Sequence, residues 1–128
     1  MNSINWQFQA AIPGGPVFAL SSNLAVDAYD VVTATVSKSG GQTTVPIQPS
    51  TTVGDVLFVA VSSSQYDPTV SYTVDSVGGS HALDAPHILT GAGAVGLLNS
   101  AAPPLNLKFT NNLANDITVQ VVVGRKIP

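Results

Sequence analysis

The chain has 128 residues, of which 45% are hydrophobic and only 9% are charged, and its formal net charge is −3. This length fits one domain that buries a core of its own, so we expect a single β-sandwich domain over residues 1–128. Four basic residues cannot form the clustered basic face that nucleic-acid binding requires, and the absence of cysteine excludes a disulfide framework.

Alternation of apolar and polar residues with a period of two predicts β-strands along the whole chain. The predicted strands cover residues 4–8, 17–20, 24–28, 32–36, 43–48, 53–61, 70–74, 105–109 and 117–123. Segments rich in Gly, Pro, Asn and Ser separate them, including 11–16 and an expected turn at 21–23. No segment carries apolar residues at helical spacing over several turns. The pattern therefore predicts an all-β fold, an antiparallel β-sandwich or jelly roll of about eight or nine short strands.

Two segments carry more apolar residues than one sandwich needs. The strand at 53–61 is hydrophobic on both faces, which is typical of a strand that is covered on both sides or meets another protein. The stretch 87–107 contains no charged residue, but its glycines and its Pro103-Pro104 pair argue against a membrane-spanning helix. We therefore interpret it as a contact with protein. The interface predicted from the two segments contains Val56, Phe58, Ile88, Leu97 and Leu98.

A glycine motif at 91–96, Gly-Ala-Gly-Ala-Val-Gly, matches the fingerprint of dinucleotide sites. That fingerprint works only where the glycines join a strand to a helix within a βαβ unit. Here two prolines follow within about two helical turns, and no βαβ unit is predicted. We interpret the motif as a loop of small residues and expect no cofactor.

His81, Asp84 and His87 form the best candidate group for metal chemistry, because two imidazoles and a carboxylate are ligands of zinc and iron. On a strand, however, residues three apart alternate sides, and Pro86 lies inside the segment. The alternative is that one histidine is exposed and the other bonds to the backbone. The chain has no Glu, no Gly-x-Ser-x-Gly motif and no spacing that indicates a catalytic triad. We predict no enzymatic activity, and a small metal-dependent enzyme is the least favoured alternative.

The polar loops support a second hypothesis, in which one end of the sandwich binds carbohydrate, with or without calcium. Asp and Asn oxygens suit calcium, and Tyr66 is the aromatic residue best placed to stack on a sugar ring. Trp6 and Tyr72 lie on apolar alternating faces and are expected in the core. The binding residues predicted on this hypothesis are Tyr66, Asp67, His81, Asp84, Asn112, Asn115 and Asp116.

The favoured hypothesis is a non-enzymatic structural module that forms a homo-oligomer or decorates a larger particle. Protein interfaces have cores depleted of charge, and a monomer with such surplus apolar surface would risk aggregation. The expected partner is the chain itself or a larger protein assembly, and carbohydrate is the alternative. The segment Met1–Trp6 carries no positive or apolar region typical of a signal peptide, so we expect a product that is cytoplasmic or carried in a particle.

Overall fold

The computed structural model describes residues 2–47, 55–75, 77–99 and 106–126. Within these residues the chain forms ten β-strands and one single-turn helix, which confirms the predicted all-β class. The elements are β1 (Asn2–Ala11), β2 (Val17–Val26), β3 (Ala28–Val36), β4 (Gly41–Pro46), β5 (Val56–Ser63), β6 (Val70–Val74), β7 (Val77–Ala82), β8 (His87–Thr90), α1 (Ala92–Val95), β9 (Asn106–Asn111) and β10 (Ile117–Arg125).

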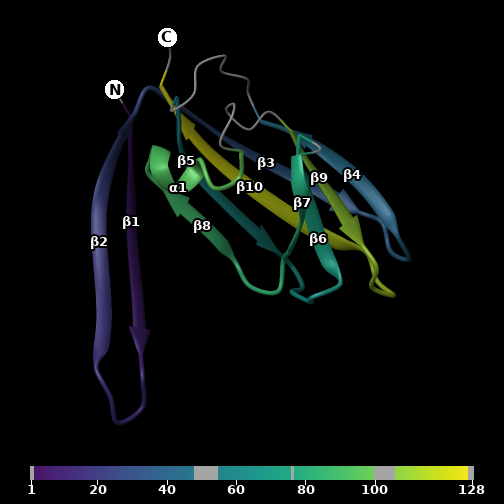
Figure 1. Cartoon of the computed structure of the whole chain (residues 1–128), viewed down its shortest axis with the longest axis horizontal. Coiled ribbons are helices and arrows are strands. Elements are labelled where there is room, and N and C mark those ends of the chain that lie inside the picture. The colour runs from purple at the N-terminus through teal and green to yellow at the C-terminus, as the bar shows by residue number, and fades with distance from the viewer. Residues whose placement is uncertain (1, 48–54, 76, 100–105, 127–128) are drawn as a thin grey trace.

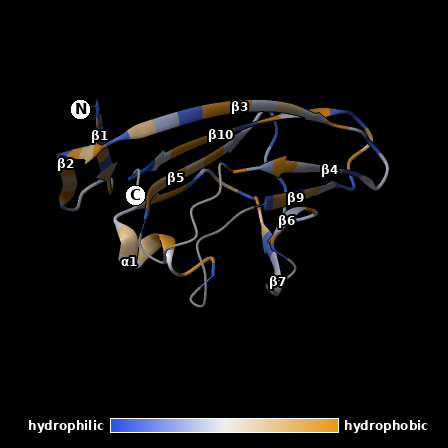
Figure 2. Ribbon diagram, turned by 90° about the horizontal axis from the view of Figure 1, so that it is seen from above, coloured by the Kyte–Doolittle hydropathy of each residue, from blue (hydrophilic) through white to orange (hydrophobic). Residues whose placement is uncertain are grey.

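Eight strands form two antiparallel four-stranded sheets (Figures 1 and 2). The strand order is β3-β10-β5-β8 in the first sheet and β4-β9-β6-β7 in the second sheet. Apart from the β6–β7 hairpin, each successive strand from β3 to β10 lies in the sheet opposite to the preceding strand. This winding is that of a jelly roll. The prediction of a sandwich or jelly roll is therefore confirmed.

The core consists of aliphatic and aromatic side chains from both sheets. The first sheet supplies alternate residues of β5 and β10, most of them valines, and the second sheet supplies Tyr72, Leu107 and Phe109. The rings of Tyr72 and Phe109, which are register partners on β6 and β9, lie 5.4 Å apart between centroids. Tyr72 is almost fully buried, as its alternating strand predicts. Trp6, which was also expected in the core, is only partly buried and lies in β1, outside the two four-stranded sheets.

Several element boundaries differ from those predicted. The Ser-Ser-Asn segment 21–23 forms no turn, because it pairs with Asn5, Trp6 and Gln7 inside one continuous strand, β2. Strands β7 and β8 were not predicted, since β7 contains two glycines and a serine and β8 has only 4 residues. The predicted strand residues 48, 53, 54 and 105 and the Pro103-Pro104 pair lie outside the described residues.

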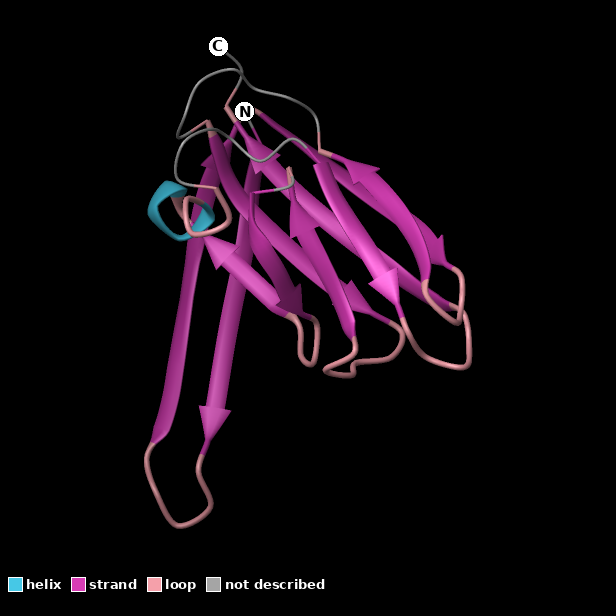
Figure 3. Cartoon of the chain, turned by 45° about the vertical axis from the view of Figure 1, so that its right-hand side comes forward, coloured by secondary structure: helices cyan, strands magenta, loops and turns pink. Residues whose placement is uncertain are grey.

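The remaining two strands, β1 and β2, form a hairpin that projects from the sandwich (Figures 1 and 3). They pair in register from Asn2↔Val26 to Ala11↔Val17, and we call residues 2–26 the arm. At its base, Ile4 and Val26 surround Gly124 of β10: a Cβ at Gly124 would lie 2.7 Å from Cδ1 of Ile4 and 3.0 Å from Cγ1 of Val26. The glycine thus permits a close approach of the arm to the first sheet.

Candidate functional site

The jelly-roll winding places four loops together at one end of the sandwich (Figure 3). These loops join β3 to β4, β5 to β6, β7 to β8 and β9 to β10. Six of the seven residues predicted to bind carbohydrate lie in them, and the seventh, His81, lies near the end of β7. The six are Tyr66, Asp67, Asp84, Asn112, Asn115 and Asp116. The fold therefore gathers residues that are up to 50 positions apart in sequence, from 66 to 116.

Hydrogen bonds between these loops already engage several of the predicted polar groups. The amide of Asn112 donates to the carbonyl of Thr69 over 3.2 Å, which ties the β9–β10 loop to the β5–β6 loop. A carboxylate oxygen of Asp116 accepts from the backbone N–H of Lys38 over 2.9 Å. These bonds connect the β9–β10 loop to the β5–β6 loop and to the β3–β4 loop. They also occupy atoms that a ligand would need.

Asp67 illustrates the same internal use of a predicted binding group. Its carboxylate accepts from the backbone N–H of Thr69 at 2.9 Å and from the Thr69 hydroxyl at 2.7 Å. The backbone bond and then the hydroxyl bond stabilise the charged form, so the pKa of Asp67 lies below its ordinary value. The carbonyl of Thr69 also accepts the hydrogen bond from Asn112 of the β9–β10 loop. Asp67 thus orders the turn that makes this contact between loops.

The predicted metal group is divided by the fold. Both histidines lie beside Tyr72: its hydroxyl is 2.7 Å from Nδ1 of His87, and its ring centroid is 5.4 Å from that of His81. Asp84 is exposed in the β7–β8 loop. Among the described residues, no group of three or more His, Cys, Asp or Glu side chains is placed to hold a metal ion.

The Tyr72 cluster has two notable chemical features. Burial raises the pKa of Tyr72 to about 12, because the interior disfavours the phenolate. The Nε2 atom of His81 is buried and has no hydrogen-bond partner among the described residues. An unpaired buried polar atom of this kind weakens the fold. The cluster joins side chains of β6, β7 and β8, and β7 and β8 are end strands of opposite sheets.

The residues predicted for an interface divide into buried and exposed groups. Val56, Phe58 and Leu98 are buried within the chain, whereas Ile88 is 56% exposed and Leu97 is 77% exposed. Phe58 pairs with Gly124 on the outward face of β5, beside the base of the arm. The hydrophobic character of β5 on both faces thus reflects a core on one side and the arm on the other.

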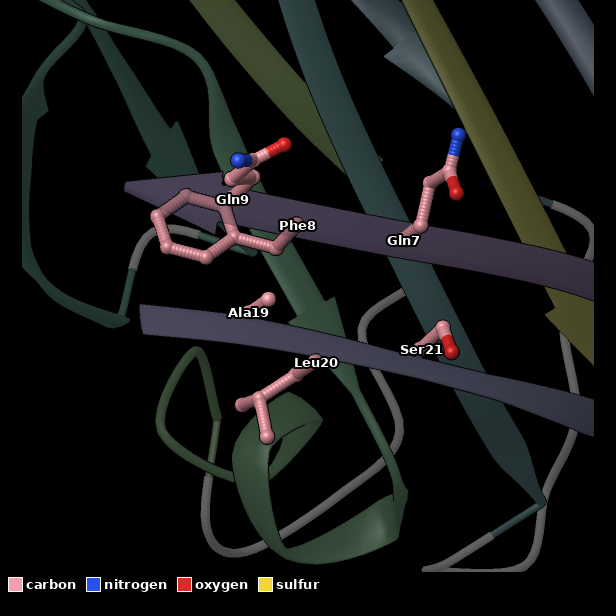
Figure 4. A pocket seen from close by; sticks show the side chains of 6 residues that line it. All are labelled: Gln7, Phe8, Gln9, Ala19, Leu20 and Ser21. Carbon is pink, nitrogen blue, oxygen red and sulfur yellow. The ribbon is translucent and has the colours of Figure 1, made fainter. Parts of the chain in front are cut away.

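Among the described residues, five of the ten exposed large hydrophobic side chains lie on the arm, which the sequence prediction did not include. Directly paired residues of an antiparallel ribbon share a face, so Phe8 with Leu20 and Ala10 with Phe18 form one apolar face. Phe8 is 49%, Phe18 56% and Leu20 50% exposed. The rings of Phe8 and Phe18 meet edge to face at 6.2 Å. Figure 4 shows Phe8 and Leu20 on the two strands, beside a shallow hollow of about 420 Å³.

A second apolar surface crosses the outward face of the first sheet. The strand registers place four residues in one row over β3, β10, β5 and β8, which we call the outer stripe: Val31, Val122, Ala60 and Ile88. Its two ends are exposed, Val31 by 52% and Ile88 by 56%. A groove of about 320 Å³ connects Ile88 with Trp6, Phe8 and Leu20 of the arm. The arm face and the outer stripe therefore form neighbouring apolar surfaces.

Comparisons with protein-family models, with curated proteins and with solved structures find no match to this chain. In the part of the chain that the structure describes, no helix has the length and hydrophobicity needed to cross a membrane. The geometry of the chain itself is therefore the basis for a functional proposal.

Proposed function

We propose that this protein is a non-enzymatic structural module that assembles with other protein through its arm, most simply with further copies of itself. The observation that carries this proposal is the half-exposed apolar face of the arm at Phe8, Phe18 and Leu20. An isolated two-stranded hairpin is marginally stable in water. A hairpin with such a face gains stability when another protein surface covers it.

Composition supports the same function. Residues 1–26 contain no charged side chain, and the outer stripe contains none either. The cores of protein interfaces are depleted of charge and enriched in aromatic residues. Large exposed apolar patches on proteins commonly mark interaction sites.

The carbohydrate-binding hypothesis has less support from the geometry. The loop end gathers its candidate residues, but Asp67, Asn112 and Asp116 are engaged within the chain. A jelly roll occurs in both capsid and lectin proteins, so the fold alone does not choose between these functions.

The experiment that tests the proposal is the solution mass, measured by light scattering on a size-exclusion column at micromolar and then sub-micromolar concentration. We expect a defined oligomer at the higher concentration. Replacement of Phe18, an exposed arm residue, by Ser should lower the mass without unfolding the protein. Leu97→Ser changes an exposed residue of the interface that was predicted from the sequence, and it should leave the mass unchanged if the arm rather than that segment makes the contact. A wild-type monomer of 13.1 kDa at every concentration would contradict the proposal.

A further inference from the structure

We infer that the arm of one copy is covered by the outer stripe of a second copy, and that two copies exchange arms in a reciprocal dimer. This inference rests on the proposed function and names the receiving surface. It follows from which apolar surfaces the single chain leaves uncovered, and from where the arm is attached.

The arm cannot cover its own apolar tip. Its base is fixed to the first sheet, where Ile4 and Val26 surround Gly124. From there the hairpin extends past the ends of the sandwich strands, as two views at 45° to each other show (Figures 1 and 3). Ile12 and Val17 next to the turn are 60% and 61% exposed. The tip therefore needs a surface that does not belong to its own sandwich.

The outer stripe matches the arm face in chemistry and in length. Both surfaces are uncharged and apolar, so neither selects a charged partner. From Phe8 to Ile12 the arm advances about 14 Å at the usual rise per strand residue. Three strand spacings separate β3 from β8, which also amounts to about 14 Å. The arm face can thus lie across all four strands of the receiving sheet.

The buried area favours exchange in both directions. Val17 pairs with Ala11 and therefore lies on the opposite face of the ribbon. The apolar face offers Phe8, Phe18 and Leu20, with Ile12 just beyond the end of β1, which together amount to roughly 400 Å². One arm on one stripe would bury about 800 Å² in total, which is typical of weak or accidental contacts, whereas two reciprocal contacts reach about 1,600 Å², the size of a stable interface. Exchange of identical elements is a common route to two-fold dimers.

The test uses two variants that damage opposite sides of this contact. Phe18→Ser with Leu20→Ser changes only exposed arm residues, and Val31→Lys places a charge on the stripe away from the groove that Ile88 shares with the arm of its own chain. Each variant alone should dimerise at least about 100-fold more weakly than wild type, because a buried lysine or lost aromatic contacts disfavour the interface. Thr44→Lys, a lysine at an exposed site on β4 of the second sheet, should leave the affinity unchanged.

Mixing the two variants identifies the receiving surface. The mixed dimer keeps one intact contact, between the arm of the Val31→Lys chain and the stripe of the arm variant, whereas each variant alone keeps none. It should therefore form more tightly than either variant pairs with itself but more weakly than wild type, because a single contact has the size of a weak interface. Light scattering and thermal unfolding of each variant verify mass and folding. A mixture that associates no more tightly than either variant alone, at the highest concentrations that light scattering allows, would overturn the inference. A Val31→Lys chain that dimerises like wild type would overturn it as well. The proposed function would survive that result if wild type remains oligomeric, and both would fail if wild type is monomeric.

Discussion

Gly124 shows how one missing side chain shapes this molecule. The residue lies in the ladder of β10, where a valine would fit the alternation, yet Ile4 and Val26 of the arm occupy the space that a Cβ would need. A glycine in a strand interior often marks such a close approach. The sequence predicted strand through residue 123, but the reason for the glycine lies 98 or more residues away, at Val26 and Ile4.

Gly124→Val should therefore destabilise the fold. The new side chain would displace Ile4 and Val26, and overpacking of this kind typically lowers the free energy of unfolding by about 1–3 kcal/mol. Urea denaturation measures the change. Gly93→Val is the matched control, because no atom lies within 4 Å of a Cβ at Gly93. An unchanged free energy of unfolding in Gly124→Val would contradict this prediction, because valine suits a strand better than glycine and only the contact with the arm should make it unfavourable.

Thr69 should control the titration of Asp67. Because the pKa of Asp67 is lowered in the folded state, its ionised carboxylate stabilises the fold at pH values above the pKa of the unfolded chain. This stabilisation is lost as the pH falls through the folded pKa. Thr69→Ala removes the hydroxyl donor but keeps the backbone N–H, so the pKa of Asp67 should rise only part of the way to its ordinary value. Carboxyl NMR titration measures this. Thr43→Ala, whose hydroxyl donates to Thr35, should leave that pKa unchanged.

At the scale of elements, local patterns predicted most strands but not their limits. The expected turn at Ser21–Asn23 was wrong because ladder pairing with β1 overrides the turn preference of Ser and Asn. The seven candidate binding residues were predicted from residue type, and their convergence at one end follows from the winding of the chain. The arm face was missed because its two halves, around Phe8 and around Phe18, were treated as separate short strands.

The arm should be the least protected element in hydrogen exchange. It has one apolar face uncovered, whereas β5 and β10 lie inside the first sheet between other strands. Local opening costs little where few apolar contacts are broken. In dilute solution, amides of β1 and β2 beyond the base should exchange at least about 1,000-fold faster than those of β10. Protection of the arm that rises with protein concentration would support assembly, and protection equal to that of β10 in a monomer would contradict it.

At the scale of the whole molecule, the alternation of apolar and polar residues was sufficient to predict the fold class but not the strand order. The two sheets are built by pairing strands that are distant in sequence, such as β3 with β10. No local signal specifies such pairs, because the same alternation fits many sandwich windings. The low content of charged residues has two structural sources: the apolar core between the sheets, and the uncharged surfaces of the arm and the outer stripe.

The oligomer should respond weakly to sodium chloride. Neither apolar surface carries charge, so there is little electrostatic attraction to screen between about 0.1 M and about 1 M salt. Sulfate, which strengthens apolar burial, should tighten association instead. Light scattering across both salt series checks this. The net charge of −3 gives a repulsion between copies that salt would screen. Dissociation by sodium chloride would indicate an interface held by charges elsewhere.

The junction between arm and sandwich consists of a single residue. Asp27 separates β2 from β3, and its backbone N–H donates to the carbonyl of Arg125 over 2.9 Å, while the Arg125 side chain pairs with Asp30. Such a junction acts as a stiff pivot rather than a tether. With a lever of about 30 Å, a rotation of only about 10° moves the tip by roughly 5 Å. Small changes around Asp27 would thus alter the angle between the two sandwiches of the proposed dimer.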